Sequence, residues 1–143
     1  MKKTITSVEE MGVFVNEFLT KIGPGSQAVV VGLSGDLGSG KTTFVQGVAR
    51  ALGVTEYVTS PTFVIQKTYT PQKQFKKLIH IDAYRITNKE ELSALRFQET
   101  VTSPNTLIFV EWPERVGDVL PPDIKHLSFL LVNEETRIVD DGA

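Results

Sequence analysis

The sequence contains no cysteine, and its 17 acidic and 15 basic residues leave a formal net charge of only −2. The lack of cysteine excludes disulfide scaffolds, thiolate metal sites and cysteine nucleophiles. Because there is no strong positive charge, no broad basic surface is available to hold nucleic acid by neutralising its phosphates. We therefore expect any contact with RNA to be indirect or very local.

Long apolar runs are also lacking, since none approaches the roughly 20 residues that a membrane-spanning helix needs. Residues 1–4 lead into a polar amphipathic segment rather than into the apolar core of a signal peptide. We therefore expect a cytoplasmic protein with no membrane contact. With 143 residues, 41% of them hydrophobic, the chain is long enough for one core and too short for two, so residues 1–143 are expected to form a single domain.

A strand, a glycine-rich loop and a helix follow one another in the first third of the chain. Residues 28–33 are nearly all apolar and largely β-branched, which is typical of a strand buried on both faces of a parallel sheet. Beyond the loop, apolar residues recur at helical spacing from 44 to 52, and Gly53 is placed to end the helix. Between the two, residues 35–42 (GDLGSGKT) match the phosphate-binding loop at every specified position. The sequence therefore predicts a nucleotide-binding P-loop.

Each residue type in this loop has a chemical role. Glycines let backbone N–H groups approach phosphate oxygens where a side chain would collide. Lys41 brings a positive charge for the β- and γ-phosphates, Thr42 offers a hydroxyl to Mg²⁺, and the following helix points its positive dipole end at the anion. We expect Lys41 to lie at the protein surface. The ATP-binding residues predicted in this segment are Gly35, Asp36, Leu37, Gly38, Ser39, Gly40, Lys41, Thr42 and Thr43.

A P-loop also needs an acidic group at the tip of a neighbouring strand to hold Mg²⁺, directly or through water. Asp82 ends the β-rich run that precedes it, and Glu111 ends the wholly apolar run 107–110. A wholly apolar strand is expected at the centre of the sheet, beside the strand of the loop, which favours Glu111 as the metal ligand together with Thr42. Asp82 is then the candidate for orienting the attacking water. The predicted catalytic residues are therefore Asp82 and Lys41. The two carboxylates could also exchange these roles, or only cap strands and pair with arginines.

The rest of the chain adds helices and strands to this unit. Two pairs with capping-box spacing are expected to begin helices, and these pairs are Ser7 with Glu10 and Thr87 with Glu90. The first helix stops before Gly23, and the second is short, with Leu92 and Leu95 facing inward. Residues 62–70 and 75–81 are expected to form a hairpin or adjacent strands, and residues 127–132 and 137–139 a closing hairpin. Together these elements predict an α/β fold, a P-loop NTPase-like three-layer sandwich whose mainly parallel sheet has some antiparallel strands.

Other polar and aromatic residues have less specific patterns. Residues 60–63 (SPTF) follow the helix after the loop, where many nucleotide-binding proteins place a segment that senses the γ-phosphate, although an ordinary turn fits too. His80 and His126 have no metal-ligand spacing and are interpreted as structural or surface histidines. Trp112 is expected to pack or to dock a partner.

Taken together, the motifs at residues 35–43 (GDLGSGKTT), 60–63 (SPTF), 80–85 (HIDAYR) and 111–114 (EWPE) closely resemble those of the bacterial TsaE (YjeE) family. The resemblance spans nearly the whole chain. Members of that family are small cytoplasmic ATPases required for making threonylcarbamoyladenosine in tRNA, beside the TsaD and TsaB proteins that transfer the threonylcarbamoyl group. The resemblance implies a P-loop ATPase that binds ATP and Mg²⁺, hydrolyses slowly alone, has TsaD and TsaB as partners, and meets tRNA only indirectly.

The resemblance also implies site residues. It assigns the ATP phosphates to the loop that ends at Lys41 and Thr42, and Mg²⁺ to Thr42 with Glu111. It brings the N-terminal segment at Thr6 and the C-terminal hairpin at Arg137 near the nucleotide. The residues that it implies for coupling the nucleotide state to the partner surface are Ser60, Thr62, His80, Tyr84 and Arg85.

Two other function classes fit a P-loop of this kind. A small-molecule kinase is the second interpretation, but the five arginines are few and no insertion is long enough for the lid that such enzymes carry. A nucleotide-gated binding module, in which ATP only sets the conformation that docks a partner, is the third. A GTPase is disfavoured because residues 88–91 (NKEE) do not continue as the guanine-recognition motif.

Overall fold

A computed structural model describes residues 1–36, 38–61, 65–86, 90–91 and 96–142, and describes Asp118 by its backbone alone. Several residues singled out in the sequence lie outside this part of the chain, namely Leu37, Thr62, Phe63, Thr87, Asn88, Lys89, Leu92 and Leu95. The predictions for the short helix near residue 90 and for much of the 60–63 segment therefore lie outside the described residues.

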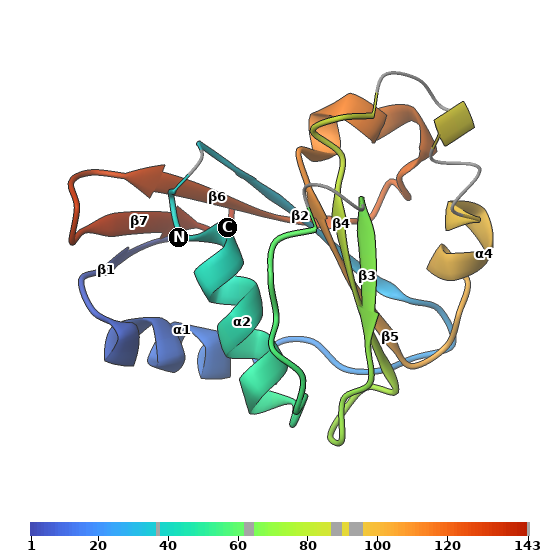
Figure 1. Cartoon of the computed structure of the whole chain (residues 1–143), viewed down its shortest axis with the longest axis horizontal. Coiled ribbons are helices and arrows are strands. Elements are labelled where there is room, and N and C mark those ends of the chain that lie inside the picture. Colours follow the sequence, from blue (N-terminus) through green and yellow to red (C-terminus); the bar gives the residue numbers. More distant parts are fainter. Residues whose placement is uncertain (37, 62–64, 87–89, 92–95, 143) are drawn as a thin grey trace.

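The described residues build one seven-stranded sheet in the order β1-β7-β6-β2-β5-β4-β3 (Figure 1). Its strands are β1 (Lys2–Ile5), β2 (Val29–Gly35), β3 (Gln66–Tyr69), β4 (Lys77–Asp82), β5 (Thr106–Glu111), β6 (Lys125–Leu131) and β7 (Arg137–Asp140). The central strands β6, β2, β5 and β4 run parallel, while β1, β7 and β3 pair antiparallel with their neighbours. The predicted α/β fold with some antiparallel strands is confirmed, and the described parts of the two predicted strand pairs do pair antiparallel, as β3 with β4 and as β6 with β7.

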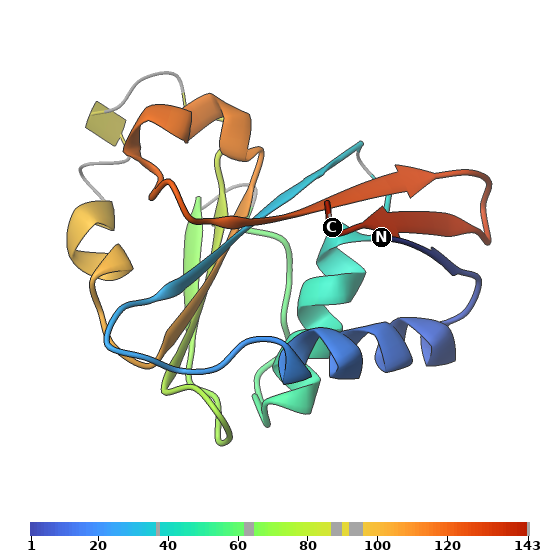
Figure 2. The same cartoon turned by 180° about the vertical axis from the view of Figure 1, so that it is seen from behind.

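Helical segments cover both faces of the sheet, which gives three layers (Figures 1 and 2). Helices α1 (Val8–Thr20) and α2 (Lys41–Ala51) share one apolar cluster with the sheet. Helix α4 (Phe97–Val101) and the 3₁₀ segment η1 (Pro113–Val119) share the other. Successive residues of β2 divide between them, since Val30 packs in the second cluster and Val31 in the first. Among the described residues, no helix is long and apolar enough to cross a membrane.

The first predicted helix begins as expected, with one difference in its cap. Ser7 is the N-cap residue, and its hydroxyl accepts the N–H of Glu10 at 3.0 Å. The Glu10 carboxylate, however, accepts from the backbone N–H of Thr6 at 2.7 Å, and from the Thr6 hydroxyl, rather than from Ser7. In a standard capping box the Glu10 carboxylate would accept from the N–H of the N-cap residue, Ser7, but here it accepts from the residue before it. This bond links the segment before α1 to the first turn of the helix.

The position of β5 determines which residues lie beside one another at the carboxyl end of the parallel strands. All six of its residues are buried, and it lies between β2 and β4, as its wholly apolar sequence predicts. In the register, Glu111 stands beside Leu33 of β2 and Asp82 of β4. Because these strands are parallel, their carboxyl ends meet at the same edge, where the P-loop also leaves β2.

Candidate functional site

The loop between β2 and α2 has the backbone that its glycines predict. Gly35, Gly38 and Gly40 have φ values of +143°, +81° and +107°, in the left-handed region that favours glycine. A Cβ atom at Gly35 would overlap the carbonyl oxygen of Phe129 in β6. Gly40 precedes the first turn of α2 and has no side chain to cap it, so the N–H groups of that turn are available to an anion.

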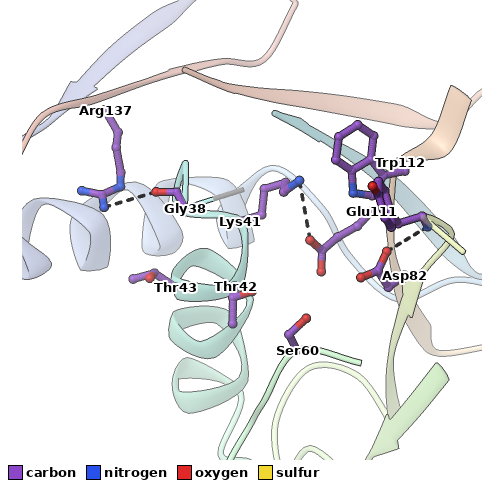
Figure 3. A pocket seen from close by; sticks show the side chains of 11 residues that line it. Gly38, Lys41, Thr42, Thr43, Ser60, Asp82, Glu111, Trp112 and Arg137 are labelled. Atoms are coloured by element: carbon purple, nitrogen blue, oxygen red, sulfur yellow. Dashed lines mark hydrogen bonds and ion pairs between the residues drawn. The ribbon is translucent and has the colours of Figure 1, made fainter. Parts of the chain in front are cut away.

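A cavity of about 680 Å³ opens above this loop, within the size range of small-molecule and cofactor sites (Figure 3). Its lining residues are Gly38, Gly40, Lys41, Thr42, Thr43, Ser60, Asp82, Tyr84, Glu111, Trp112 and Arg137. The cavity therefore unites the P-loop, both candidate carboxylates and several residues implied for partner coupling. Gly35, Asp36, Ser39, Thr6, His80 and Arg85, also singled out in the sequence, do not line it.

Lys41 is buried, so the expectation of a surface lysine is wrong. Only 5% of the residue, the first of α2, is exposed. Its ammonium group donates to the carbonyl of Gly35, lies 3.8 Å from Oε1 of Glu111 and stands 4.6 Å from the centre of the Trp112 ring. The lysine nevertheless faces the cavity (Figure 3), so its charge remains within reach of a ligand.

Glu111 lies between a cation and a histidine rather than beside an arginine. Its Oε2 is 2.6 Å from Nε2 of His80, while Oε1 faces Lys41. His80 is completely buried and Glu111 is 4% exposed. His80 is therefore a structural rather than a surface histidine, as one of the two interpretations held, and it cannot touch a partner itself. His126, the second histidine, is exposed on β6.

Asp82 faces the same cavity from the end of β4. It is 5% exposed, and its Oδ1 accepts the backbone N–H of Tyr84 at 2.9 Å, which fixes the carboxylate at the strand end. Two carboxylates and the Thr42 hydroxyl thus line one cavity. Oxygen donors of this kind suit Mg²⁺, which usually takes one or two carboxylates and completes its shell with waters and phosphate oxygens.

A polar group of the P-loop is buried without a partner among the described residues. The hydroxyl of Ser39 is buried and has no hydrogen-bond partner in the part of the chain that the structure describes, so the loop holds an unused polar group. The described residues also contain no cluster of three or more histidine and acidic side chains that could hold a metal by themselves.

Trp112 was not predicted as a site residue, but it lines the cavity. It directly follows β5 with φ +59°, an unusual value for a bulky side chain. Its ring lies 5.2 Å from that of Tyr84, and the guanidinium carbon of Arg115 lies 5.1 Å from the Tyr84 ring. The sequence signal that could have identified Trp112 as a site residue is its position immediately after Glu111, at the carboxyl end of a central strand. Tyr84 itself is 49% exposed.

The two chain ends reach the P-loop, as the family resemblance implied. Arg137 of β7 lines the main cavity, and its Nη2 is 3.5 Å from the carbonyl oxygen of Gly38 (Figure 3). A neighbouring cavity of about 260 Å³ is lined by Thr6, Thr43 and Arg137 among others. Arg85 is exposed and lines neither cavity, although it directly follows Tyr84, which lines the main one.

Comparison with known proteins places this site in a family. Residues 5–139 match the protein-family description "Threonylcarbamoyl adenosine biosynthesis protein TsaE". The tRNA threonylcarbamoyladenosine biosynthesis protein TsaE of Borreliella burgdorferi is 39% identical over 109 residues, covering 76% of this chain and 77% of the relative. The protein of the same name from Treponema pallidum is 40% identical over 108 residues, with coverage of 76% and 77%.

A solved structure has the same fold. The crystal structure of YdiB from Bacillus subtilis matches with a TM-score of 0.74 and 26% sequence identity, covering 97% of this chain and 82% of that chain. The α/β architecture described above is therefore a P-loop NTPase-like fold.

Proposed function

Because this chain belongs to the TsaE family, we propose that it is an Mg²⁺-dependent ATPase that supports threonylcarbamoyl transfer to adenosine in tRNA, together with TsaD and TsaB. Its contact with tRNA is through those partners. The observation that carries the proposal is the meeting of the P-loop, buried Lys41 and two carboxylates around one cavity.

ATP binding falls to the loop and to the first turn of α2. Backbone N–H groups of residues 38–42 donate hydrogen bonds to the phosphate oxygens, and Lys41 exchanges its present neighbours for the β- and γ-phosphates. The Thr42 hydroxyl and the Glu111 carboxylate hold Mg²⁺, which supplies positive charge against the phosphate oxygens. Arg137 and Thr6 approach the nucleotide from the two ends of the chain.

Hydrolysis falls to Asp82 and Lys41. From the end of β4, the fixed Asp82 carboxylate orients the water that attacks the γ-phosphate. Lys41 neutralises charge that develops on the transferred group. Turnover is slow in the isolated chain and rises when partners bind.

Partner coupling falls to the exposed rim of the cavity. Tyr84 is half exposed and its ring contacts that of Trp112, which lines the cavity. The neighbouring Arg85 is exposed. Ser60 joins them as an exposed residue that lines the same cavity. Of the other two residues implied for this role, Thr62 lies outside the described residues, and His80 is completely buried. Protein interfaces favour aromatic and arginine side chains of this kind.

Two measurements test the proposal. Calorimetric titration of the whole chain with ATP, with and without Mg²⁺, should show one saturable site whose affinity increases with the metal. Affinity purification with mass spectrometry should then recover the TsaD and TsaB homologues. A chain that does not bind ATP contradicts the proposal, and a burst of ADP formation that depends on a metabolite would instead identify a small-molecule kinase.

A further inference from the structure

Among the described residues, the side chain of His80 has one polar partner within hydrogen-bonding distance, which is the carboxylate of Glu111. The histidine lies within β4, its side chain points to the same face of the sheet as Asp82, and none of it is exposed. Its Nε2 is 2.6 Å from Oε2 of Glu111, whereas its Nδ1 is buried and has no hydrogen-bond partner there. An ionised carboxylate can only accept, so the tautomer with the hydrogen on Nε2 donates it to Glu111.

Glu111 and Lys41 are close, but they do not form a hydrogen bond. Their charged atoms are 3.8 Å apart, although both residues are buried. Charge-assisted hydrogen bonds between an ammonium and a carboxylate close to about 2.7–2.9 Å, and attraction is strengthened where water is excluded. Two contacts oppose that closure, because the Gly35 carbonyl holds the lysine and His80 holds the far oxygen of the carboxylate.

We propose that His80 is a positioning residue that anchors the Glu111 carboxylate away from Lys41, so that both groups stay available to a magnesium nucleotide. This inference rests on the proposed function and goes beyond it. Without the anchor, Glu111 would close on Lys41, and each would neutralise the charge that the other should offer to the phosphates or the metal. Residues that orient a metal ligand typically change metal affinity by 10–100-fold when they are replaced.

The test is a double-mutant cycle on the whole chain, with the Mg²⁺ concentration for half-maximal ATP binding as the readout. The cycle compares His80→Leu, Glu111→Ala and the double variant with the wild type. We expect His80→Leu to raise the required Mg²⁺ concentration roughly tenfold. In the Glu111→Ala background, the same change should have no further effect, because His80 then has no carboxylate to position.

Two more variants separate positioning from packing. His80→Gln keeps an N–H donor at similar reach, so it should restore Mg²⁺ dependence to within about threefold of the wild type, since the donated hydrogen bond is what matters. If His80→Leu does not fold, His80→Asn replaces it, because the shorter amide cannot reach Glu111. The matched control is His126→Leu, a change at the exposed histidine of β6, which should leave the Mg²⁺ requirement unchanged.

Equal effects of the His80 change in the wild-type and Glu111→Ala backgrounds would overturn the inference, because His80 would then act independently of Glu111. A wild-type Mg²⁺ requirement in both His80→Leu and His80→Asn would overturn it as well. If the wild-type chain binds no ATP, the proposed function itself fails. Failure of the inference and failure of the proposed function are distinguishable, because a Mg²⁺ requirement can be measured only in a chain that binds ATP.

Discussion

Lys41 is held inside the protein by a carbonyl, a carboxylate and an aromatic ring, which the sequence motif alone does not reveal. A buried charge that loses its partner is costly to the protein. We therefore expect Lys41→Met, which keeps the apolar stem, to remove most ATP affinity and to lower the free energy of unfolding by about 1–3 kcal/mol, because Glu111 loses its cation. Calorimetric ATP titration and chemical denaturation measure the two effects.

The control for this change is Lys73→Met, at an exposed lysine in the loop between β3 and β4. It should alter neither quantity. Undiminished ATP affinity in a folded Lys41→Met protein would remove the P-loop assignment.

Asp82 and Glu111 lie at the same level of the sheet, but different functions are expected of them. Glu111→Gln should weaken Mg²⁺-dependent ATP binding by roughly tenfold or more, because a metal ligand acts in the ground state. Asp82→Asn should leave affinity nearly unchanged and lower kcat by about 10²-fold, because orienting a water acts mainly in the transition state. Measuring Kd and kcat for both variants over a Mg²⁺ series decides between them. The reverse pattern would make Asp82 the metal ligand.

Much of the candidate site follows from the sequence, because its residues belong to a contiguous motif or directly end apolar strands. The contacts of His80 and Trp112 do not follow from it. They depend on which strands are neighbours and on the register between them, and a single sequence leaves both open. The burial of Lys41 has the same origin, since it requires the β5 carboxylate to stand beside the P-loop.

At the scale of elements, the start of α1 depends on side chains that cap its first turn. Ser7→Ala should lower the free energy of unfolding by about 1 kcal/mol, because the N–H of Glu10 loses its acceptor. Denaturant unfolding measures this change. Ser26→Ala is the control, because Ser26 is exposed in the connection before β2 and should give a wild-type value. A Ser7→Ala protein as stable as the control would contradict the capping role.

The same cap makes a prediction about pH. Hydrogen bonds from the Thr6 side chain and then from its backbone hold the pKa of Glu10 below the ordinary value of a glutamate. The folded-state pKa is thus the lower one, so the stabilisation is complete above the unfolded pKa and is lost as pH falls through the folded pKa. Glu10→Gln should therefore lose less stability than the wild type on acidification. Melting temperatures over an acidic pH series measure this, and parallel curves would contradict it.

The elements that the sequence did not predict are short or rely on distant partners. Strand β1 has four residues and pairs with β7, which lies near the other end of the chain. Helix α4 has five residues and begins after Arg96, whose backbone is left-handed. Neither is long enough for a hydrophobic period to be read. By contrast, α1, α2 and the central strands carry clear periodic or continuous apolar patterns, and they form where expected.

Over the molecule as a whole, the sheet brings segments from both ends of the chain beside the P-loop, and Tyr84 and Arg85 are exposed. We expect Arg85→Ala to keep the wild-type melting temperature and ATP affinity but to lose ATP turnover stimulated by TsaD and TsaB. A calorimetric scan and phosphate release with and without partners measure these quantities. A melting temperature several degrees lower, or ATP turnover that the partners stimulate as in the wild type, would show that Arg85 has only a structural role.

Mg²⁺-dependent ATP hydrolysis at this P-loop is proposed to support modification of tRNA. The most direct measurement is the formation of threonylcarbamoyladenosine in a reconstituted reaction containing TsaD, TsaB, tRNA and the threonylcarbamoyl donor, with this chain added. We predict sustained modification with the wild-type chain and ATP, and almost none with Lys41→Met. Equal modification with Lys41→Met, or with no added chain, would contradict the claim.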